Sequence, residues 1–551
     1  MSIAVLPAEL LTRAERLADG GEPEAALNLL GPLLKTCPQA LAIAVEASAA
    51  MGNYDDARRY ADSLARAQNA VGSGEHSLAR VRAMIVLSQL AWLEGHVSET
   101  WTLLTDARHI AASPVAELLV TTARAAAELR AERYEESIAS AETAMAMARA
   151  SGLGDALAAR ARDDSAVTLA SCSATRPNPD EGQIAELDRL SHPATDLGAA
   201  ARTRAINNSL VALLGQENLS DAEAWSLYDR AHARARLFGG KSLLSIARQG
   251  MDLAARTGDW ERGWAIGTGH IATEASRSER VAIAAKLAQF AFARGLAAEA
   301  ARWGRRAMSE STAIDVIWVR VYAYLGGVIA AAASGGSAEH ALNEYGNCMS
   351  PTSHAQRAGR AWEAAEVALT AGTDAAVVVR FLDRVIPGGA VDNLCPAAKA
   401  YAQAVLKDHS GVDASSGELV AVGDRIGCRN AIWRATLQVQ LVRAYRREGR
   451  HTAAVLALTE GQRLVDRWPG RLRDELRQLS ITEVSQPPAL STRQAQILEF
   501  ILEGASNRNI SETLGISERT VAVHVSEILA RTGHASRTAL AVAELRRRLM
   551  G

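Results

Sequence analysis

The chain has 551 residues, too many for a single hydrophobic core, so we expect two to four domains. Its five cysteines are far apart and form no CxxC pair, which fits a reducing cytosol and excludes a disulfide framework or a cysteine zinc site. No apolar run of about 18 residues occurs, and no basic segment precedes an apolar core at the N-terminus, so we expect neither a membrane span nor a signal peptide.

The formal net charge of −2 would indicate no particular partner if it were evenly spread, but it is not. Residues 429–551 contain 19 arginines and 12 acidic residues, a net charge of +7, which leaves −9 on residues 1–428. A basic end on an acidic body is typical of a DNA-binding module joined to a body that DNA repels.

Residues 1–172 and 199–480 predict repeated helical hairpins. Between apolar stretches of helical period, a glycine or polar residue is followed by a short polar turn and by a small residue five positions on. Glycine ends one helix without strain, acidic residues favour the start of the next, and the small residue lets the two helices approach closely. Within each run the turns begin 31 to 43 residues apart. The first run is Gly21–Ala26, Gly52–Ala57, Gly95–Thr100 and Glu132–Ser137; the second is Gly258–Gly263, Gly295–Ala300 and Gly336–Ala341, and Gly449–Ala454 follows separately.

This pattern resembles the tetratricopeptide repeat, whose period is about 34 residues, although proline seldom closes a unit and several units lack the aromatic residue. Hairpins that cannot bury an apolar face alone must stack, so the resemblance implies a superhelical array with a concave surface. We expect an N-terminal array over residues 1–172 and a second repeat segment over residues 199–480.

Three stretches interrupt the helical pattern. Ser173–Gly198 is predicted to be a long loop or a sub-domain boundary, and His409–Gly417 a second loop. Ile481–Ala489 contains Pro487-Pro488 and is the predicted linker, because paired prolines stop helices and stiffen a connection.

Two motifs in the body resemble nucleotide-binding loops; we assign the first to a turn between helices and the second to helix packing. Ala235–Ser242 ends in Gly-Gly-Lys-Ser, but a phosphate loop needs a preceding strand, and its flanks here predict helices. Gly267–Ala272 also lacks a preceding strand. The tryptophans are expected to be core anchors between repeats, with an aromatic wall in a ligand groove as the alternative; they include Trp92, Trp101, Trp225, Trp303, Trp318 and Trp362.

No catalytic signature is found: the G-x-S-x-G, HExxH and EF-hand patterns are absent, and the histidines are scattered singly. We therefore expect no enzyme activity, no catalytic residues, no metal site and no cofactor.

Residues 490–551 predict four short helices. The first covers residues 490–502 with Ser491 or Thr492 as its cap, and the second runs from Ser506 or Asn507 to Leu514. Gly515-Ile516-Ser517 forms a tight turn, and a third helix runs to about residue 531. The fourth covers residues 537–549, and the helix-turn-helix motif spans about residues 507–531. Another repeat hairpin is the alternative, but the three-residue turn behind paired prolines argues against it.

At these residues the chain resembles the LuxR/NarL-type DNA-binding domain of bacterial transcription regulators. The shared positions are Leu490-Ser491-Thr492-Arg493, Gly504, Ser506-Asn507, Ile510, Leu514, Ile516-Ser517, Thr520-Val521, His524 and Arg537-Thr538. With the helical body before it, the whole resembles the C-terminal portion of large MalT-like regulators. It lacks the intact phosphate loop of their nucleotide-binding domain, and no receiver-type pattern with a phosphorylatable aspartate is evident.

The resemblance implies base contacts from the exposed face of the third helix, here Ala522, Val523 and Ser526. Lysine is common in the family where this chain has Ala522. Phosphate anchoring is expected from Ser506, Asn507 and Ser517 at helix starts and from Arg508, Arg519, Thr520, Arg531 and Arg537. The family usually dimerises through its last helix, here through Ala539, Val542, Leu545 and Leu549.

The sequence thus predicts an all-α protein: a tetratricopeptide-like helical-hairpin superhelix followed by a C-terminal four-helix helix-turn-helix domain. The predicted function is that of a cytoplasmic, nucleoid-associated bacterial transcription regulator, a homodimer that binds double-stranded DNA and RNA polymerase but no membrane. Its repeat groove would sense a peptide, protein or small-molecule effector. One alternative is an interaction scaffold with a weak or silent DNA-binding domain. Another is a sigma-factor-like subunit, although the aromatic-rich DNA-melting region that it would need is not found.

Overall fold

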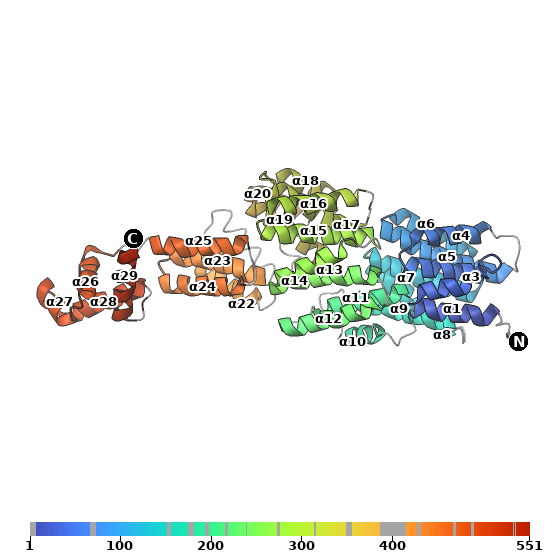
Figure 1. Cartoon of the computed structure of the whole chain (residues 1–551), viewed down its shortest axis with the longest axis horizontal. Coiled ribbons are helices and arrows are strands. Elements are labelled where there is room, and N and C mark those ends of the chain that lie inside the picture. The colour runs from blue at the N-terminus through green and yellow to red at the C-terminus, as the bar shows by residue number, and fades with distance from the viewer. Residues whose placement is uncertain are drawn as a thin grey trace. The chain divides into compact units, whose positions relative to one another are not determined.

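The computed structural model describes most of the chain as helices and their connections. Every element in the described ranges is an α-helix, which confirms the all-α prediction (Figure 1). The described residues are 7–66, 73–150, 156–174, 181–192, 197, 199–214, 219–237, 240–272, 276–312, 314, 316–348, 355–385, 415–426, 431–466, 470–485, 490–532, 534 and 536–550.

The chain forms two compact units. The first consists of Met1–Ala254, Glu261–Gln289 and Ala298–Met349. Its helices, some with an end in the other unit, are α1 (Pro7–Asp19), α2 (Pro23–Leu30), α3 (Pro38–Ala50), α4 (Tyr54–Arg66), α5 (Ser73–Glu94), α6 (Val97–Ile110), α7 (Pro114–Arg130), α8 (Tyr134–Ala150), α9 (Ala156–Ala174), α10 (Glu181–Leu190), α11 (Ala199–Leu214), α12 (Asp221–Arg236), α13 (Gly240–Thr257), α14 (Trp260–His270), α15 (Arg277–Ala293), α16 (Ala297–Ser311), α17 (Ile317–Ala333) and α18 (Glu339–Cys348).

The second unit consists of Ala255–Trp260, Phe290–Ala297 and Ser350–Gly551. Its helices are α19 (Ala355–Thr370), α20 (Ala375–Val385), α22 (Ser416–Ile426), α23 (Ala431–Arg447), α24 (His451–Leu464), α25 (Arg471–Ser485), α26 (Thr492–Leu502), α27 (Asn507–Leu514), α28 (Glu518–Thr532) and α29 (Arg537–Met550).

The predicted hairpins form as expected, with left-handed glycines between their helices. Gly52, Gly95 and Gly449 have φ values of 82°, 92° and 70°, a region that side chains with a Cβ rarely adopt. The small residue five positions on is buried in seven of the eight predicted turns, and the exception, Ala341, is half-buried. In the third hairpin Thr100 fills this place, and its hydroxyl donates a hydrogen bond of 3.1 Å to the Ser88 carbonyl.

One predicted turn has no glycine, and two other turns differ from the predicted pattern. Glu132 takes the glycine position of the fourth hairpin with a φ of 60°. Between α17 and α18 the left-handed residue is Gly335 with a φ of 78°, one residue before the predicted Gly336. Gly372, with a φ of 83°, connects α19 and α20 in a turn that the pattern did not identify, because Val377 follows it in place of a small residue.

The hairpins stack through the first helix of each pair. In the N-terminal part of the first unit, α3 packs on α5, α5 on α7, α7 on α9 and α9 on α11. The buried residues form a series of local clusters, each shared by about three consecutive helices; the clusters begin at Ala14, Leu41, Val81, Leu118, Val167 and Ile206. Such a series of neighbour-to-neighbour cores is the property of a solenoid.

The prediction of a loop or boundary at Ser173–Gly198 is wrong, because α10 lies inside this stretch. Ile184, Leu187 and Leu190 recur at helical spacing and are 5%, 0% and 1% exposed. They share one core with α9 and α11, so the array continues through the stretch. The prolines on either side concealed this helix in the sequence.

The other two predicted interruptions are described only in part. Residues 409–414 of the second loop lie outside the described residues, and its last two residues, Ser416 and Gly417, begin α22. Helix α25 continues to Ser485, five residues into the predicted linker, while residues 486–489 lie outside the described residues.

The first nucleotide-loop resemblance, predicted to be a turn between helices, is partly helical: α12 ends at Arg236 and α13 begins at Gly240, so Gly240, Lys241 and Ser242 belong to α13. In the second resemblance Gly267 lies inside α14. A Cβ on Gly267 would come within 2.7 Å of Met251 Cε and 2.8 Å of Leu287 Cδ2, so this glycine serves close helix packing.

The tryptophans are divided between the core and the surface. Trp92, Trp303 and Trp362 are 6%, 8% and 0% exposed, as core anchors would be. The other three of the six tryptophans named in the sequence analysis are half-buried, each under the guanidinium group of an arginine. They are Trp101 under Arg133, Trp225 under Arg262 and Trp318 under Arg248.

Across the described ranges, no helix has the length and apolar character needed to cross a membrane. Cys172 is a buried thiol that donates to the Ser137 hydroxyl at 3.4 Å, and Cys37 is a half-buried thiol.

Candidate nucleic-acid interface

The last four helices, α26 to α29, share a core of their own. Its buried side chains come from every one of these helices; they are Ile497, Leu498, Ile501, Ile510, Val521, Val525, Ile528 and Leu540. Helix α26 begins with a capping box, in which the Ser491 hydroxyl accepts from Gln494 N at 3.2 Å and the Gln494 side chain accepts from Ser491 N at 3.1 Å.

The caps and the turn of the helix-turn-helix motif form as predicted. Ser506 caps α27 by accepting a hydrogen bond of 3.2 Å from Asn509 N. Gly515 ends α27 with a φ of 62°, in the left-handed region. Ser517 then accepts from Thr520 N at 3.1 Å at the start of α28. The N-termini of α27 and α28 therefore each have backbone N–H groups that can bind an anion.

The predicted base-contacting residues all lie on one exposed face of α28. Ala522, Val523 and Ser526 are exposed, and Val523 keeps 51% of its surface accessible. The opposite face carries Val521 and Val525, which are buried at 0% and 9% exposure. Arg519 is also exposed and lies three and four residues before Ala522 and Val523, so it belongs to the same face. We call Arg519, Ala522, Val523 and Ser526 the outer face of α28.

Some predicted phosphate ligands are exposed to solvent and bond only to neighbouring side chains; the Ser506 hydroxyl, for example, donates to Asn509 Oδ1 at 2.8 Å. Ser506, Ser517 and Thr520 are exposed, and the Thr520 hydroxyl lies 2.8 Å from the Ser517 hydroxyl. The side chain of Arg508 is 75% exposed and forms only an ion pair of 3.1 Å with Glu512, which a phosphate could displace at little cost because exposed pairs are weak.

Arg531 and Arg537 have partners inside the domain. Arg537 donates to Asn507 Oδ1 at 2.9 Å and also to the Ala505 carbonyl, so it ties the start of α29 to the start of α27. Arg531 donates to Gln494 Oε1 at 2.8 Å and joins α28 to α26. Both guanidinium groups therefore hold the helix-turn-helix in shape.

Sequence reasoning did not identify Gln494 as a structural centre of the domain. Its side chain is only 3% exposed, accepts from Arg531, and donates to Glu527 Oε2 at 2.9 Å. Arg493 beside it donates to the Leu514 carbonyl at 2.6 Å, where it satisfies the C-terminal end of α27. The Ser491-x-x-Gln494 spacing of a capping box was the available signal for Gln494.

The predicted dimerisation helix exposes apolar side chains. Val542 and Leu545 are 47% and 45% exposed on α29, and Ala539 is exposed as well. Leu540, on the other side of the helix, is buried in the domain core at 2% exposure. The side chain of Leu549 lies outside the described residues.

Among the described residues no group of histidine, cysteine, aspartate and glutamate side chains could hold a metal ion.

Comparison with known proteins identifies the C-terminal part of the chain. Residues 488–543 match the family described as GerE, bacterial regulatory proteins of the luxR family. No curated protein matches the chain.

Two solved structures are similar to the chain as a whole. The APC/C hetero-tetramer Cut9–Hcn1 is 12% identical, with 97% of this chain and 96% of that chain covered at a TM-score of 0.37. Yeast Tom70 is 9% identical, with coverages of 87% and 88% at a TM-score of 0.29. The helix-turn-helix geometry and the family match agree on the same segment: residues 488–543 are a DNA-binding domain of the luxR family, joined to an all-helical repeat body.

Proposed function

We propose that this protein is a bacterial, cytoplasmic transcription regulator that binds double-stranded DNA as a dimer. The observation that carries the proposal is the luxR-family domain. The outer face of its α28 is exposed, and so are the N-terminal ends of α27 and α28. A recognition helix of this kind lies in the major groove with its N-terminal half toward the bases. The proposal includes RNA polymerase as a partner.

The residues of the interface would divide the work of binding. Val523 can contact a thymine methyl group, and Ser526 can bond to a base edge. Arg508, Arg519 and Thr520, with the N–H groups of α27 and α28, would bind phosphates and fix the register. The DNA backbone would also be contacted by Asn507, Arg531 and Arg537, which at the same time hold the helices in position.

The test is genome-wide DNA occupancy of the full chain beside an Arg519→Ala, Thr520→Ala double variant. We expect discrete promoter peaks for the unchanged protein and their loss in the double variant. Arg463→Ala is the control, since this arginine is 65% exposed on α24 and removes the same charge outside the domain. The neutral Ala522, where the family commonly has lysine, favours one other candidate: a scaffold whose domain no longer binds DNA. Absence of peaks for the unchanged protein would support it.

Dimerisation would occur through the exposed side of α29. Val542→Glu combined with Leu545→Glu should convert a dimer to a monomer in sedimentation velocity and weaken binding to paired half-sites. Val455→Glu on α24 is the matched control, because Val455 is 43% exposed and lies outside the DNA-binding domain. An unchanged sedimentation coefficient in the double variant would place the dimer contact elsewhere.

The repeat body would sense an effector and mask or free the DNA-binding domain. The acidic balance of residues 1–428, the basic end and the proline-containing connection support this regulation. Deletion of residues 1–485 tests it, since the four C-terminal helices have their own core. We expect altered DNA affinity and loss of regulated promoter response; unchanged values of both would refute masking.

A further inference from the structure

A cavity of about 160 Å³ lies in the first unit, on the face formed by the first helices of successive hairpins. Each of five helices contributes to its wall: α3 through Glu46, α5 through Arg82, α7 through Thr122, α9 through Arg160 and α11 through Arg204. No second helix of any hairpin takes part in the wall. The cavity is therefore a product of repeat stacking and faces the inner side of the array.

Most of the cavity wall is apolar. Its large apolar residues are Ile85, Val86, Leu90, Leu93, Leu119 and Leu157, and alanines from α3, α7 and α9 fill the spaces between them. A dry cavity of roughly 150 Å³ lined by such side chains accepts a benzene-sized molecule. The volume thus suits a small apolar group.

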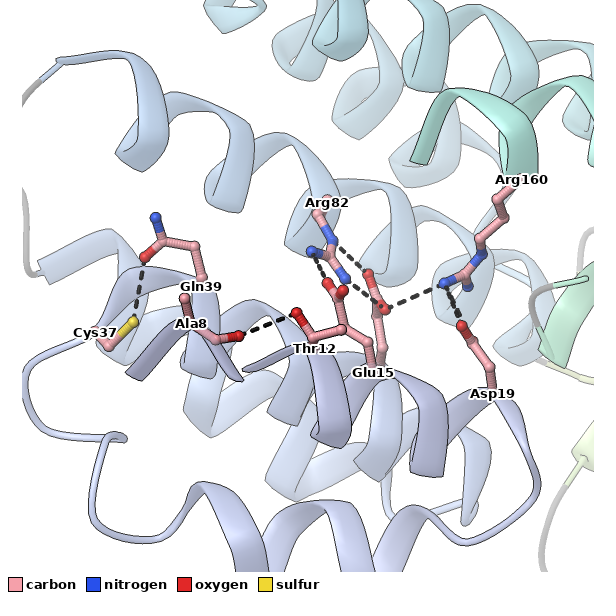
Figure 2. A network of polar contacts seen from close by, with 9 residues as sticks. Ala8, Thr12, Glu15, Asp19, Cys37, Gln39, Arg82 and Arg160 are labelled. Carbon is pink, nitrogen blue, oxygen red and sulfur yellow. Dashed lines mark hydrogen bonds and ion pairs between the residues drawn. The ribbon is translucent and has the colours of Figure 1, made fainter. Parts of the chain in front are cut away.

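Two of the arginines at the cavity are neutralised by carboxylates, as Figure 2 shows. Arg82 bonds Glu46 through Nε at 2.9 Å and Nη2 at 3.0 Å, and it bonds Glu15 through Nη1 at 2.7 Å. Arg160 pairs with Asp19 at 3.1 Å and lies 3.9 Å from Glu46. The positive charges of Arg82 and Arg160 are therefore balanced without a bound anion.

Arg204, on the same cavity wall, lacks such a neutralising partner. Its Nη2 makes one long hydrogen bond of 3.5 Å to Thr168 Oγ1, and its buried Nε has no hydrogen-bond partner. Within the described part of the chain no carboxylate oxygen lies within 4.0 Å of its guanidinium nitrogens. Burial lowers the pKa of Arg204, against the opposing charge of Asp164.

Arg130 adds a second uncompensated charge beside Arg204. Burial and the positive charge of Arg204 lower the pKa of Arg130 to about 9, and no described carboxylate pairs with it. Two guanidinium groups that repel each other leave a local excess of positive charge at Arg204, on the cavity wall. A buried charge without a partner is costly, and a bound anion would remove that cost.

We propose that this cavity binds a small amphipathic carboxylate, with its apolar group among the leucines and its acid group on Arg204. A monoanion fits better than a phosphate dianion, because Asp164 also lines the cavity and would repel the second charge. The inference rests on the proposed function in one respect, that the bound carboxylate is the effector of the regulator. Binding of the carboxylate to the cavity does not depend on DNA.

The test is calorimetric titration of the full chain, without DNA, with hexanoate and 4-phenylbutyrate and with their neutral amides. We expect at least one acid to bind and its amide to bind at least roughly tenfold more weakly, because charge-assisted hydrogen bonds are lost. Arg204→Gln should weaken acid binding by a similar factor. Arg162→Gln should not, since Arg162 lies on α9 outside the cavity wall, is 50% exposed and pairs with Asp163.

A second measurement keeps the test valid if a variant is poorly folded. In the ligand-free protein Arg204→Gln should raise the Tm, because it removes an uncompensated buried charge. Equal binding of acid and amide, no binding by either acid, or a lowered Tm in Arg204→Gln would overturn the inference. Acid binding that leaves promoter occupancy unchanged would keep the site and reject only the effector role.

Discussion

Glu132 is the one non-glycine residue of the described chain with a positive φ, and its neighbours explain why. Its N–H bonds the Leu129 carbonyl at 3.0 Å, and the N–H of Arg133 bonds the Glu128 carbonyl at 2.9 Å. The same two bonds close the turn at Gly52, where the N–H of Asn53 reaches the Ser48 carbonyl at 2.9 Å. The helix end therefore imposes a left-handed residue, whatever its side chain.

Glu132→Gly should raise the free energy of unfolding by about 1 kcal/mol, because a side chain in the left-handed region costs about that much. Thermal and urea denaturation measure the change. Gly449→Ala should produce the reverse effect at a turn where a Cβ meets open space. Gly95→Ala should cost more, since its Cβ would come within 2.6 Å of Ile314 Cα. A less stable Glu132→Gly protein would contradict this account of the turn.

Asp19 gives the first unit a dependence on pH. Burial, together with the charges of Glu46 and Asp164, raises the pKa of Asp19 from 3.8 to about 6, although Arg160 opposes this. Between these two pH values the folded chain holds a proton that the unfolded chain releases, so stability falls as the pH rises through this window. Glu46 behaves oppositely: burial alone would raise its pKa, but the charges of Arg82 and Arg160 lower it.

Asp19→Asn should therefore stabilise the first unit at neutral pH by about 1–2 kcal/mol, and the gain should disappear near about pH 4. Unfolding followed from pH 4 to pH 8 checks this. A stabilisation that stays constant with pH would show that the Asp19 charge is not its cause.

The partners in this ion network could not be predicted from the sequence. Arg82 bonds a residue 67 positions away and Arg160 one 141 positions away, and no local pattern encodes such pairs. Ser506, Gly515 and Ser517 could be predicted, because a cap or a left-handed turn depends on residues only a few positions apart.

At the scale of elements, the distinction between local sequence signals and contacts with distant residues also separates α27 and α28 from α10. The two helices of the motif carry their own start and stop signals, so the sequence was sufficient to place them. The identity of α10 comes instead from the burial of Leu187 against neighbouring helices. Tertiary packing thus decided what local propensity left open.

Gln494 completes the cap of α26 and joins α26 to α28, so its removal should loosen both helices. Gln494→Ala deletes the acceptor for Ser491 N and Arg531 and the donor to Glu527, and should cost about 1–3 kcal/mol of domain stability. Gln496→Ala, at an exposed position two residues on, should cost little. Circular dichroism melts of the two variants give the comparison; equal losses would deny Gln494 a special place.

At the scale of the whole molecule, the charge is arranged so that DNA affinity depends strongly on salt. Residues 429–551 carry +7 and the remaining residues −9, so phosphate contacts must form against a repulsive body. The stacked hairpins could be predicted from their recurring turns. The division into two units could not, because it depends on which neighbouring hairpins pack together.

Arg519→Ala should lower DNA affinity and reduce the slope of log affinity against log salt by about 1, the value for one lost phosphate contact. Binding measured between low and moderate salt provides both numbers. Arg463→Ala should leave the slope unchanged, because its α24 site is outside the interface. Equal slopes for Arg519→Ala and the unchanged protein would remove Arg519 from the phosphate contacts.

The ion pair between Arg160 and Asp19 also has a mechanical consequence. In a simple solenoid each hairpin contacts only its neighbours, so a force on one end peels the hairpins away in turn. Here one ion pair joins α9 to α1, and a second joins Arg82 of α5 to Glu15 of α1. A force on the N-terminus would have to break both ion pairs before the first hairpin could detach, so the first nine helices should resist stretching as one block.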